Sequence, residues 1–246
     1  MTPGSRTRPD TVAVMQPYLF PYLGYFQLIA ASGSFVFYDD VAFIKGGWIN
    51  RNRVLAPGGG LQVFSAALDG GQSSSRSIAD TPLSARRDWQ RKFARTLRES
   101  YARAPHVDAV CALVDRVLDA PGDSIADLAC RSVRAVCDHV GLAPRFERSS
   151  QFAPETRALD RTGRLIELTR RLGGERYLNL EGGRALYGPG PFAEAGLELR
   201  FLAPRLEPYP QGRKADFVPG LSVLDALMWT PPETVRDMAL GGEIAP

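Results

Sequence analysis

Two adjacent carboxylates are the residues of this sequence whose types and spacing point most directly to chemistry. Asp39 and Asp40 follow a run of β-branched and aromatic residues at 34–38, which predicts a short buried strand. Open α/β sheets bind ligands outside the carboxyl ends of their strands, so we expect one carboxylate to act as a general base or to hold a cation. The spacing equally fits a structural role, in which the pair caps the following turn or forms ion pairs with Arg51 and Arg53.

Polar and aromatic residues flank this doublet on both sides. Gln16 and Tyr18 lie in a turn that also contains two prolines, and we expect an amide beside aromatic rings to form the wall of a pocket. The loop after the doublet contains Lys45, Asn50 and Arg51 together with two glycines. A cation, an amide and a guanidinium in one loop suit an anionic, polar ligand such as a phosphate, a sugar nucleotide or a pantetheine arm.

Residues that form covalent nucleophile systems are sparse. The chain has two histidines, His106 and His139, and neither lies beside a nucleophile elbow. Its three cysteines, Cys111, Cys130 and Cys137, have no metal-ligand spacing and lie on predicted helical stripes, so we expect them in the core. The sequence therefore predicts no metal site, no bound cofactor and no thiol or Ser/His mechanism.

The composition is that of an ordinary globular chain. Of 246 residues, 44% are hydrophobic and 23% are charged, which excludes fibrous, collagen-like and wholly disordered classes. A net charge of +3 is too weak a bias to indicate a nucleic-acid partner. No run approaches the roughly 20 apolar residues that a spanning helix needs, and no cleavage pattern of a signal peptide follows the start. Because an odd number of cysteines without motif spacing fits a reduced compartment, we expect a cytoplasmic protein without a membrane span.

The elements that must position these residues alternate between strands and helices. Strands are predicted at 11–15 and 34–38, and helical periodicity dominates a middle segment at about 84–141. Beyond that segment, strands and helices alternate up to a last helix at 222–229. This pattern predicts an α/β fold with a mostly parallel sheet and a helical insertion in the middle of the chain.

Three motifs carry a resemblance to a known family. They read MQPYLFPYLGYFQLI at 15–29, FYDDVAFIKGGWINRNR at 37–53 and YPQGRKADFVPGLSVLDALMW at 209–229. In these motifs and their order, the chain resembles the WbqC-like family of bacterial proteins. The resemblance implies a single domain over residues 11–230, and it leaves residues 1–10 as a disordered leader and residues 231–246 as a C-terminal tail.

The resemblance also implies a function. WbqC-like proteins are found among enzymes that build O-antigen and other surface polysaccharides, or in natural-product clusters. The resemblance therefore implies a transferase that attaches an acyl or aminoacyl group to an amine. The family pattern adds Tyr209, Gln211 and Asp225 to the substrate-binding residues named above. In the mechanism we expect, Asp39 or Asp40 removes a proton from the attacking amine, while amides and a cation such as Lys45 stabilise the oxyanion.

The expected partners are a small-molecule amine acceptor, such as an amino sugar or a natural-product intermediate, and an acyl carrier protein that supplies a thioester. Two other functions fit the same residues. One is a glycosyltransferase-like enzyme in which Asp39 and Asp40 hold Mg²⁺ or Mn²⁺ against a sugar nucleotide. The other is a non-catalytic protein that presents its aromatic turn and the segment 208–219 to an enzyme partner in a biosynthetic cluster.

Overall fold

Short runs of β-branched and aromatic residues form the centre of the molecule, which is a six-stranded sheet. The computed structural model describes residues 10–85, 88–212 and 216–245. The strands lie in the order β5-β2-β1-β6-β7-β8, and all neighbours are parallel except β7 and β8. These strands are β1 (Thr11–Met15), β2 (Ser34–Phe37), β5 (Arg145–Arg148), β6 (Arg176–Leu180), β7 (Glu198–Ala203) and β8 (Glu243–Ala245). The predicted α/β fold with a mostly parallel sheet is thereby confirmed.

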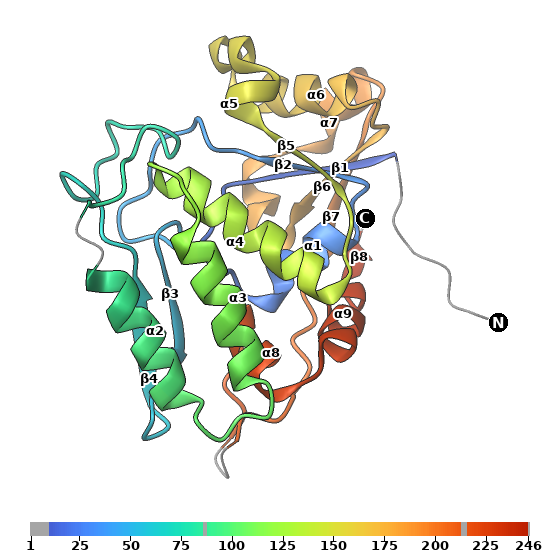
Figure 1. Ribbon diagram of the computed structural model, residues 1–246. Helices are drawn as coiled ribbons and strands as arrows, with labels where there is room; N and C mark the ends of the chain where they lie inside the picture. Colours follow the sequence, from blue (N-terminus) through green and yellow to red (C-terminus); the bar gives the residue numbers. More distant parts are fainter. Residues whose placement is uncertain (1–9, 86–87, 213–215, 246) are drawn as a thin grey trace.

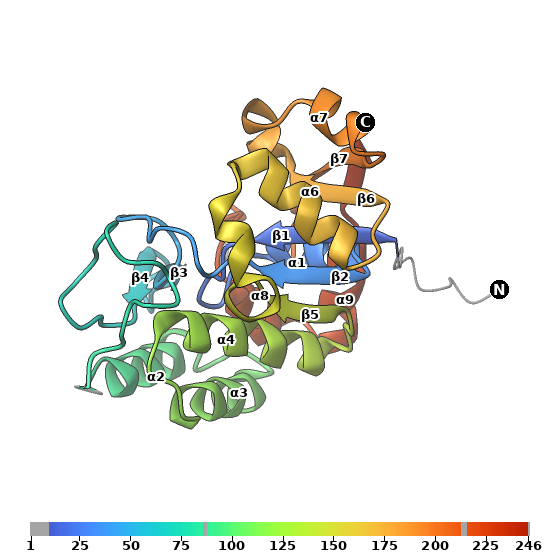
Figure 2. The same cartoon turned by 90° about the horizontal axis from the view of Figure 1, so that it is seen from above.

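The side chains of the central strands alternate between two apolar cores, one on each face of the sheet. Phe35 and Phe37 pack into the larger core with α1, α4 and α9, whereas Val12 and Val36 pack into the smaller core with α6 and α7. Figure 1 shows α6 and α7 on one side of the strands and α4 on the other, and in Figure 2, seen from above, α6 lies over the strands. The helices are α1 (Leu23–Ala30), α4 (Ile125–Val140) and α9 (Pro232–Leu240) on the first face, and α5 (Ser149–Phe152), the 3₁₀ helix η1 (Pro154–Ala158), α6 (Arg161–Arg171) and α7 (Pro189–Glu194) on the second.

The first strand of the chain, β1, lies in the middle of the sheet, and later strands are added on both sides of it. From β1 the chain adds β2 and then β5 on one side, and later β6 and β7 on the other side. Counted along the chain, the parallel strands therefore have the doubly wound order 3-2-1-4-5. In such sheets ligands bind outside the carboxyl ends of the strands at this switch point, which here lies between β1 and β6.

The segment between β2 and β5 leaves the sheet to form a two-stranded ribbon and three helices (Figure 1). Its elements are β3 (Arg51–Leu55), β4 (Leu61–Ser65), α2 (Asp88–Ser100), α3 (Val107–Asp119) and α4. The helical insertion that periodicity predicts is present, and Cys111, Cys130 and Cys137 are buried in it, as expected. The strand β3 forms where the sequence pattern predicts a polar loop, and stacking of Phe64 on Phe93, with ring centroids 4.2 Å apart, joins the ribbon to α2. Across the described part of the chain, no helix combines the length and the apolar character that crossing a membrane requires.

The C-terminal segment is part of the fold, in contrast to the expected tail at 231–246. It forms α9 and β8, and a short helix α8 (Val223–Trp229) precedes it. Val235 and Ala239 of α9 are buried, and the carbonyl of Met238 accepts a hydrogen bond from Gln27 of α1. The apolar face of α9 is short, and it is buried by contact with α1 and α4. The sequence pattern of α9 alone therefore does not show that this helix belongs to the core. The expected leader at 1–10 lies outside the described residues, except for Asp10.

Candidate functional site

A cavity of about 750 Å³ opens at the carboxyl ends of β1, β2 and β6, where the strand order predicts a ligand site. We call it the β1/β6 cavity. Its walls come from the ends of these strands, from α6 and from the 3₁₀ helix η2 (Glu181–Leu186), which follows β6. The lining residues are Val14, Met15, Gln16, Tyr18, Tyr38, Val41, Ala42, Ile44, Arg161, Leu165, Tyr177, Asn179, Leu180, Gly182, Gly183, Leu186 and Tyr187. Such a concave, largely apolar space with few polar groups is typical of a small-molecule site.

The polar groups of the β1/β6 cavity are amides and phenols. The side-chain amide of Gln16 has no hydrogen-bond partner among the residues that the structure describes. Asn179 is the penultimate residue of β6, and its Oδ1 accepts a hydrogen bond from the backbone N–H of Leu180. The backbone of Gly183 lies against the Asn179 amide, because a Cβ atom at position 183 would lie 2.5 Å from Nδ2. The hydrogen bond from Leu180 and the close approach of Gly183 together fix the direction of the Asn179 side chain.

The tyrosines of the β1/β6 cavity are neutral hydrogen-bond donors at physiological pH. Burial raises the pKa of Tyr18 above its usual value. Burial also raises the pKa of Tyr38, although the positive charge of Arg164 acts in the opposite direction. Burial raises the pKa of Tyr187 in the same way. None of these phenols can therefore serve as a base near neutral pH, and each can donate its proton in a hydrogen bond.

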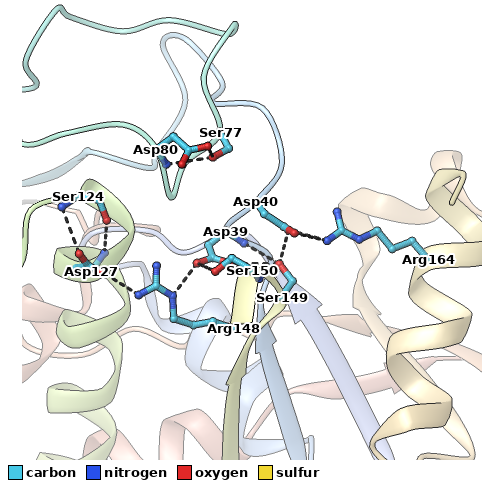
Figure 3. A network of polar contacts seen from close by, with 10 residues as sticks. All are labelled: Asp39, Asp40, Ser77, Asp80, Ser124, Asp127, Arg148, Ser149, Ser150 and Arg164. Carbon is cyan, nitrogen blue, oxygen red and sulfur yellow. Dashed lines mark hydrogen bonds and ion pairs between the residues drawn. The ribbon is translucent and has the colours of Figure 1, made fainter. Parts of the chain in front are cut away.

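The acidic doublet lies beside this cavity, at the end of β2, and it is buried in a network of ion pairs (Figure 3). The Asp39 carboxylate accepts hydrogen bonds from Arg148 Nε at 2.6 Å and from Ser150 Oγ at 2.8 Å. The Asp40 carboxylate binds Arg164 Nη2 with both oxygens, at 2.7 and 2.6 Å. The hydroxyl of Ser149 lies between the two carboxylates and donates to either of them.

This placement corrects the expected surroundings of the doublet. Its cationic partners are Arg148 and Arg164, not Arg51 and Arg53, and neither carboxylate lines the β1/β6 cavity. The doublet instead supports the cavity from behind, because the guanidinium of Arg164 lies over the ring of Tyr38 at 4.6 Å. A carboxylate that is buried and bound by arginine has no open position for an amine proton or a metal ion. The described residues also contain no group of three or more His, Cys, Asp and Glu that could hold a metal ion.

The loop that follows the doublet does not contribute its predicted polar residues to the cavity. Lys45 is exposed, whereas Asn50 is buried and donates from Nδ2 to the carbonyl of Ala66 at 2.9 Å. The Arg51 Nε donates to the carbonyl of Gly47 at 3.0 Å, so this guanidinium closes its own loop. These three residues therefore lie outside the β1/β6 cavity, in contrast to the expectation that they line one site with Gln16.

The C-terminal trio forms a separate cluster around the buried carboxylate of Asp225. Tyr209 Oη donates to it at 2.8 Å, Gln211 Nε2 donates at 3.0 Å, and Tyr101 Oη donates at 2.6 Å. Gln211 lines another cavity, of about 540 Å³, which shares no lining residue with the β1/β6 cavity. Tyr209, Gln211 and Asp225 thus form a cluster of their own, whereas Gln16 and Tyr18, which we expected in the same site, line the β1/β6 cavity. The periodicity of α2 predicts a core position for Tyr101 and gives no sign that its hydroxyl binds Asp225.

Most residues that line the β1/β6 cavity are absent from the sequence-based set, among them Tyr38, Asn179, Arg161 and Tyr187. Tyr38 and Asn179 lie at the ends of β2 and β6, so the rule that singled out the doublet, applied to every predicted strand end, would have found both. Arg161 and Tyr187 come from α6 and from the segment after η2, and no spacing connects them with β1. Of the predicted residues, Gln16 and Tyr18 are the ones that line the cavity.

Comparison with known proteins supports the resemblance that the motifs suggest. The model of the WbqC-like protein family matches residues 16–237. The chain is also similar to a protein of Mycobacterium tuberculosis named "Uncharacterized protein Rv1507c", with 26% identity over 219 residues that cover 88% of this chain and 92% of that protein. No solved structure gives a significant match. The family match extends into α9, in agreement with the packing of this helix.

Proposed function

Because the chain belongs to the WbqC-like protein family, we propose that it is a transferase that moves an activated acyl or aminoacyl group onto an amine, with the β1/β6 cavity as its substrate site. The observation that carries this proposal is the position and lining of the cavity. It lies at the switch point of a doubly wound sheet, and its largely apolar wall carries a few amide and phenol groups.

The lining residues favour direct transfer over a covalent intermediate. Among the described residues that line the β1/β6 cavity there is no cysteine, serine, histidine or carboxylate, so the usual nucleophiles and bases are absent from its wall. The side-chain amides of Gln16 and Asn179, together with the hydroxyl of Tyr38, are donors for a developing oxyanion. The remaining catalytic contribution is the positioning of donor and acceptor in one cavity.

The proposed reaction needs no base from the protein when the donor is a thioester. The nitrogen of the neutral amine attacks the thioester carbonyl and forms the C–N bond, and the negative charge moves to the carbonyl oxygen. When the carbonyl reforms, the C–S bond breaks and the thiolate departs. The proton that the amine loses ends on this thiolate, so the products are an amide and a thiol.

The role of Asp39 and Asp40 changes within this proposal from general base to support of the cavity wall. Their ion pairs with Arg148 and Arg164 also weaken the alternative of a metal-dependent enzyme that uses a sugar nucleotide. A non-catalytic partner protein is the other alternative. Its support is the exposed apolar side chains of Ile44 and Leu186 at the edge of the cavity, which a partner would cover.

Partners and location belong to the same proposal. The acceptor is a small amine, such as an amino sugar or a natural-product intermediate, and an acyl carrier protein supplies the thioester. We place the reaction in the cytoplasm, and the three free cysteines, which are buried and unpaired, support this location.

Amide formation by the purified chain tests the proposal. Acyl and aminoacyl thioesters on a carrier protein are incubated with a panel of amino sugars, and mass spectrometry detects the amide. We expect Gln16→Ala to lower kcat by about 10²-fold, as loss of one oxyanion donor does. Gln151→Ala is the matched control, because Gln151 is exposed on α5 and does not line the cavity.

Two outcomes would contradict the proposal. An absence of amide with every donor and acceptor, in a folded protein that instead binds a protein partner through the cavity edge, would favour the partner-protein alternative. Turnover that Gln16→Ala and Gln151→Ala leave equally unchanged would show that the reaction takes place elsewhere in the molecule.

A further inference from the structure

Arg161 is a cation on the wall of the β1/β6 cavity, and it forms no ion pair with any residue that the structure describes. It is the first residue of α6, is exposed and lines the cavity beside Leu165. No residue within the described ranges forms a hydrogen bond or an ion pair with its guanidinium. Among the described residues, no aspartate or glutamate lines the cavity to balance its charge.

The other arginines of α6 whose contacts the structure gives are engaged. Arg164 binds Asp40, Arg170 donates to the carbonyl of Ala195, and Arg171 pairs with Glu155 and Glu167. The carboxylate of Asp160, next to Arg161 in the chain, accepts the backbone N–H of Gly163 at the start of the helix. Arg161 therefore differs from the other arginines of α6, whose guanidinium groups bind acceptors within the described part of the protein.

Apart from the amides of Gln16 and Asn179, the other side chains that line the β1/β6 cavity are apolar or aromatic. Tyr187 lies near Arg161, because the positive charge of the guanidinium acts to lower the pKa of the phenol, although burial outweighs it. The side chains of Ile44 and Leu186, which also line the cavity, are 51% and 55% exposed. A ligand that satisfies all of these groups combines an anionic group with a less polar body. A guanidinium is well suited to a phosphate, because its parallel N–H groups match two phosphate oxygens.

We propose that Arg161 binds a phosphate group of the substrate, so that the β1/β6 cavity selects a phosphate-bearing donor or acceptor over its neutral analogue. This inference rests on the proposed function and adds the substrate class to it. The phosphate can belong to the donor, as in a phosphopantetheine thioester, or to the acceptor, as in an amino-sugar phosphate. The phosphate is a diester when the phosphopantetheine is attached to a carrier protein and a monoester in an amino-sugar phosphate, and in both cases its free oxygens can bind the same guanidinium.

Isothermal titration calorimetry of the full chain with two matched pairs of probes tests this inference. The first pair is 4′-phosphopantetheine and pantetheine, and the second is glucosamine 6-phosphate and glucosamine. In at least one pair we expect the phosphate-bearing member to bind about tenfold or more tightly than the neutral member, the effect of a hydrogen-bonded charge pair. The pair that shows the preference identifies the donor or the acceptor as the source of the phosphate.

Arg161→Gln is expected to reduce the preference to about twofold or less, since a glutamine keeps a polar side chain but no charge. The matched control is Arg157→Gln in η1, an exposed arginine that does not line the cavity, and it should keep the full preference. Equal binding within both pairs, no binding of either phosphate, or a preference that Arg161→Gln retains would overturn the inference. Amide formation from a neutral donor and a neutral acceptor would leave the transferase proposal in place, whereas phosphate binding without any turnover would remove the transferase proposal alone.

Discussion

The carboxylate of Asp40 accepts hydrogen bonds from Arg164 Nη2 with both of its oxygens, and this ion pair is almost fully withdrawn from solvent, with side chains 2% and 6% exposed. The withdrawal of two charges from water costs several kcal/mol per ion, and their attraction offsets this cost only when both partners are present and well aligned. The pair also holds Arg164 over the ring of Tyr38, on the wall of the β1/β6 cavity. Its contribution is therefore to shape the site and to keep it folded.

Asp40→Asn is expected to destabilise the protein by about 3–5 kcal/mol, because it leaves the charge of Arg164 buried without a counter-charge. Urea denaturation followed by circular dichroism measures the loss as a lower transition midpoint. The control is Asp88→Asn, which removes an ion pair with Arg91 whose side chains are 77% and 82% exposed, and which should leave the midpoint almost unchanged. Similar small effects of both substitutions would show that the buried pair does not hold the site together.

The same residues show how far the sequence can predict a site. The strand-end rule correctly places Asp39 and Asp40 at the edge of the sheet that carries the cavity. Their partners Arg148 and Arg164 are 109 and 124 positions away along the chain, and no local spacing connects them. Whether a carboxylate faces a cavity or a buried arginine depends on such distant contacts. For that reason the sequence predicts that Asp39 and Asp40 lie at this edge of the sheet, but it does not predict that their carboxylates point toward arginines and away from the cavity.

Among the elements, α4 connects the insertion with the end of β2. The helix begins with a capping box, in which the Ser124 hydroxyl accepts the N–H of Asp127 and the Asp127 carboxylate accepts the N–H of Ser124. The same carboxylate accepts a hydrogen bond from Arg148 at 2.5 Å, and Arg148 also binds Asp39. The start of α4 is thus joined to the acidic doublet through one guanidinium.

Acid titration should show this connection. Burial acts to raise the pKa of Asp127, but hydrogen bonds from Arg148 and Ser124 outweigh it and hold the pKa below its ordinary value. A lowered folded-state pKa contributes stability that is present above the unfolded pKa, about 3.9, and is lost as the pH falls through the folded value. We therefore expect Asp127→Asn to have a lower urea midpoint than the wild type at pH 7, and the gap to narrow as the pH falls below about 4. A gap that stays constant down to pH 2 would mean that the charge of Asp127 contributes nothing.

The turn from β6 into η2 gives a second test at the scale of the element. A Cβ atom at position 183 would lie 2.5 Å from Asn179 Nδ2, so Gly183→Ala must displace the amide that lines the β1/β6 cavity. We expect this variant to lower kcat in the amide-forming assay by about tenfold, since a small displacement of an oxyanion donor weakens it. Gly188→Ala is the control, because a Cβ atom there meets no atom within 4 Å and the residue does not line the cavity. Equal activity of the two variants would exclude Asn179 from the proposed site.

Across the whole molecule, periodicity predicts most elements but not how they assemble. The runs at 11–15 and 34–38 are short and rich in β-branched and aromatic residues, as strands of a covered sheet are, and the helices at 84–141 follow a clear period. The strand order has no such local signature, because it depends on which apolar faces meet after the chain has folded. The ribbon strand β3, with the sequence RNRVL, is stabilised by pairing with β4 and by contact with α8, so its own composition did not predict it.

The boundary of the folded unit is the last point at which sequence and structure differ, and truncation tests it. A chain that ends at Thr230 lacks α9 and β8, whereas a chain that ends at Gly242 lacks only β8. The first truncation removes the buried side chain of Val235 and one of the acceptors of the Gln27 amide, so we expect a loss of about 3 kcal/mol or more, or failure to fold. The second removes a three-residue edge strand and should lower the thermal midpoint far less. If the two truncated chains melted at the same temperature, α9 would not belong to the core, and the domain would end at residue 230 as the motifs alone suggest.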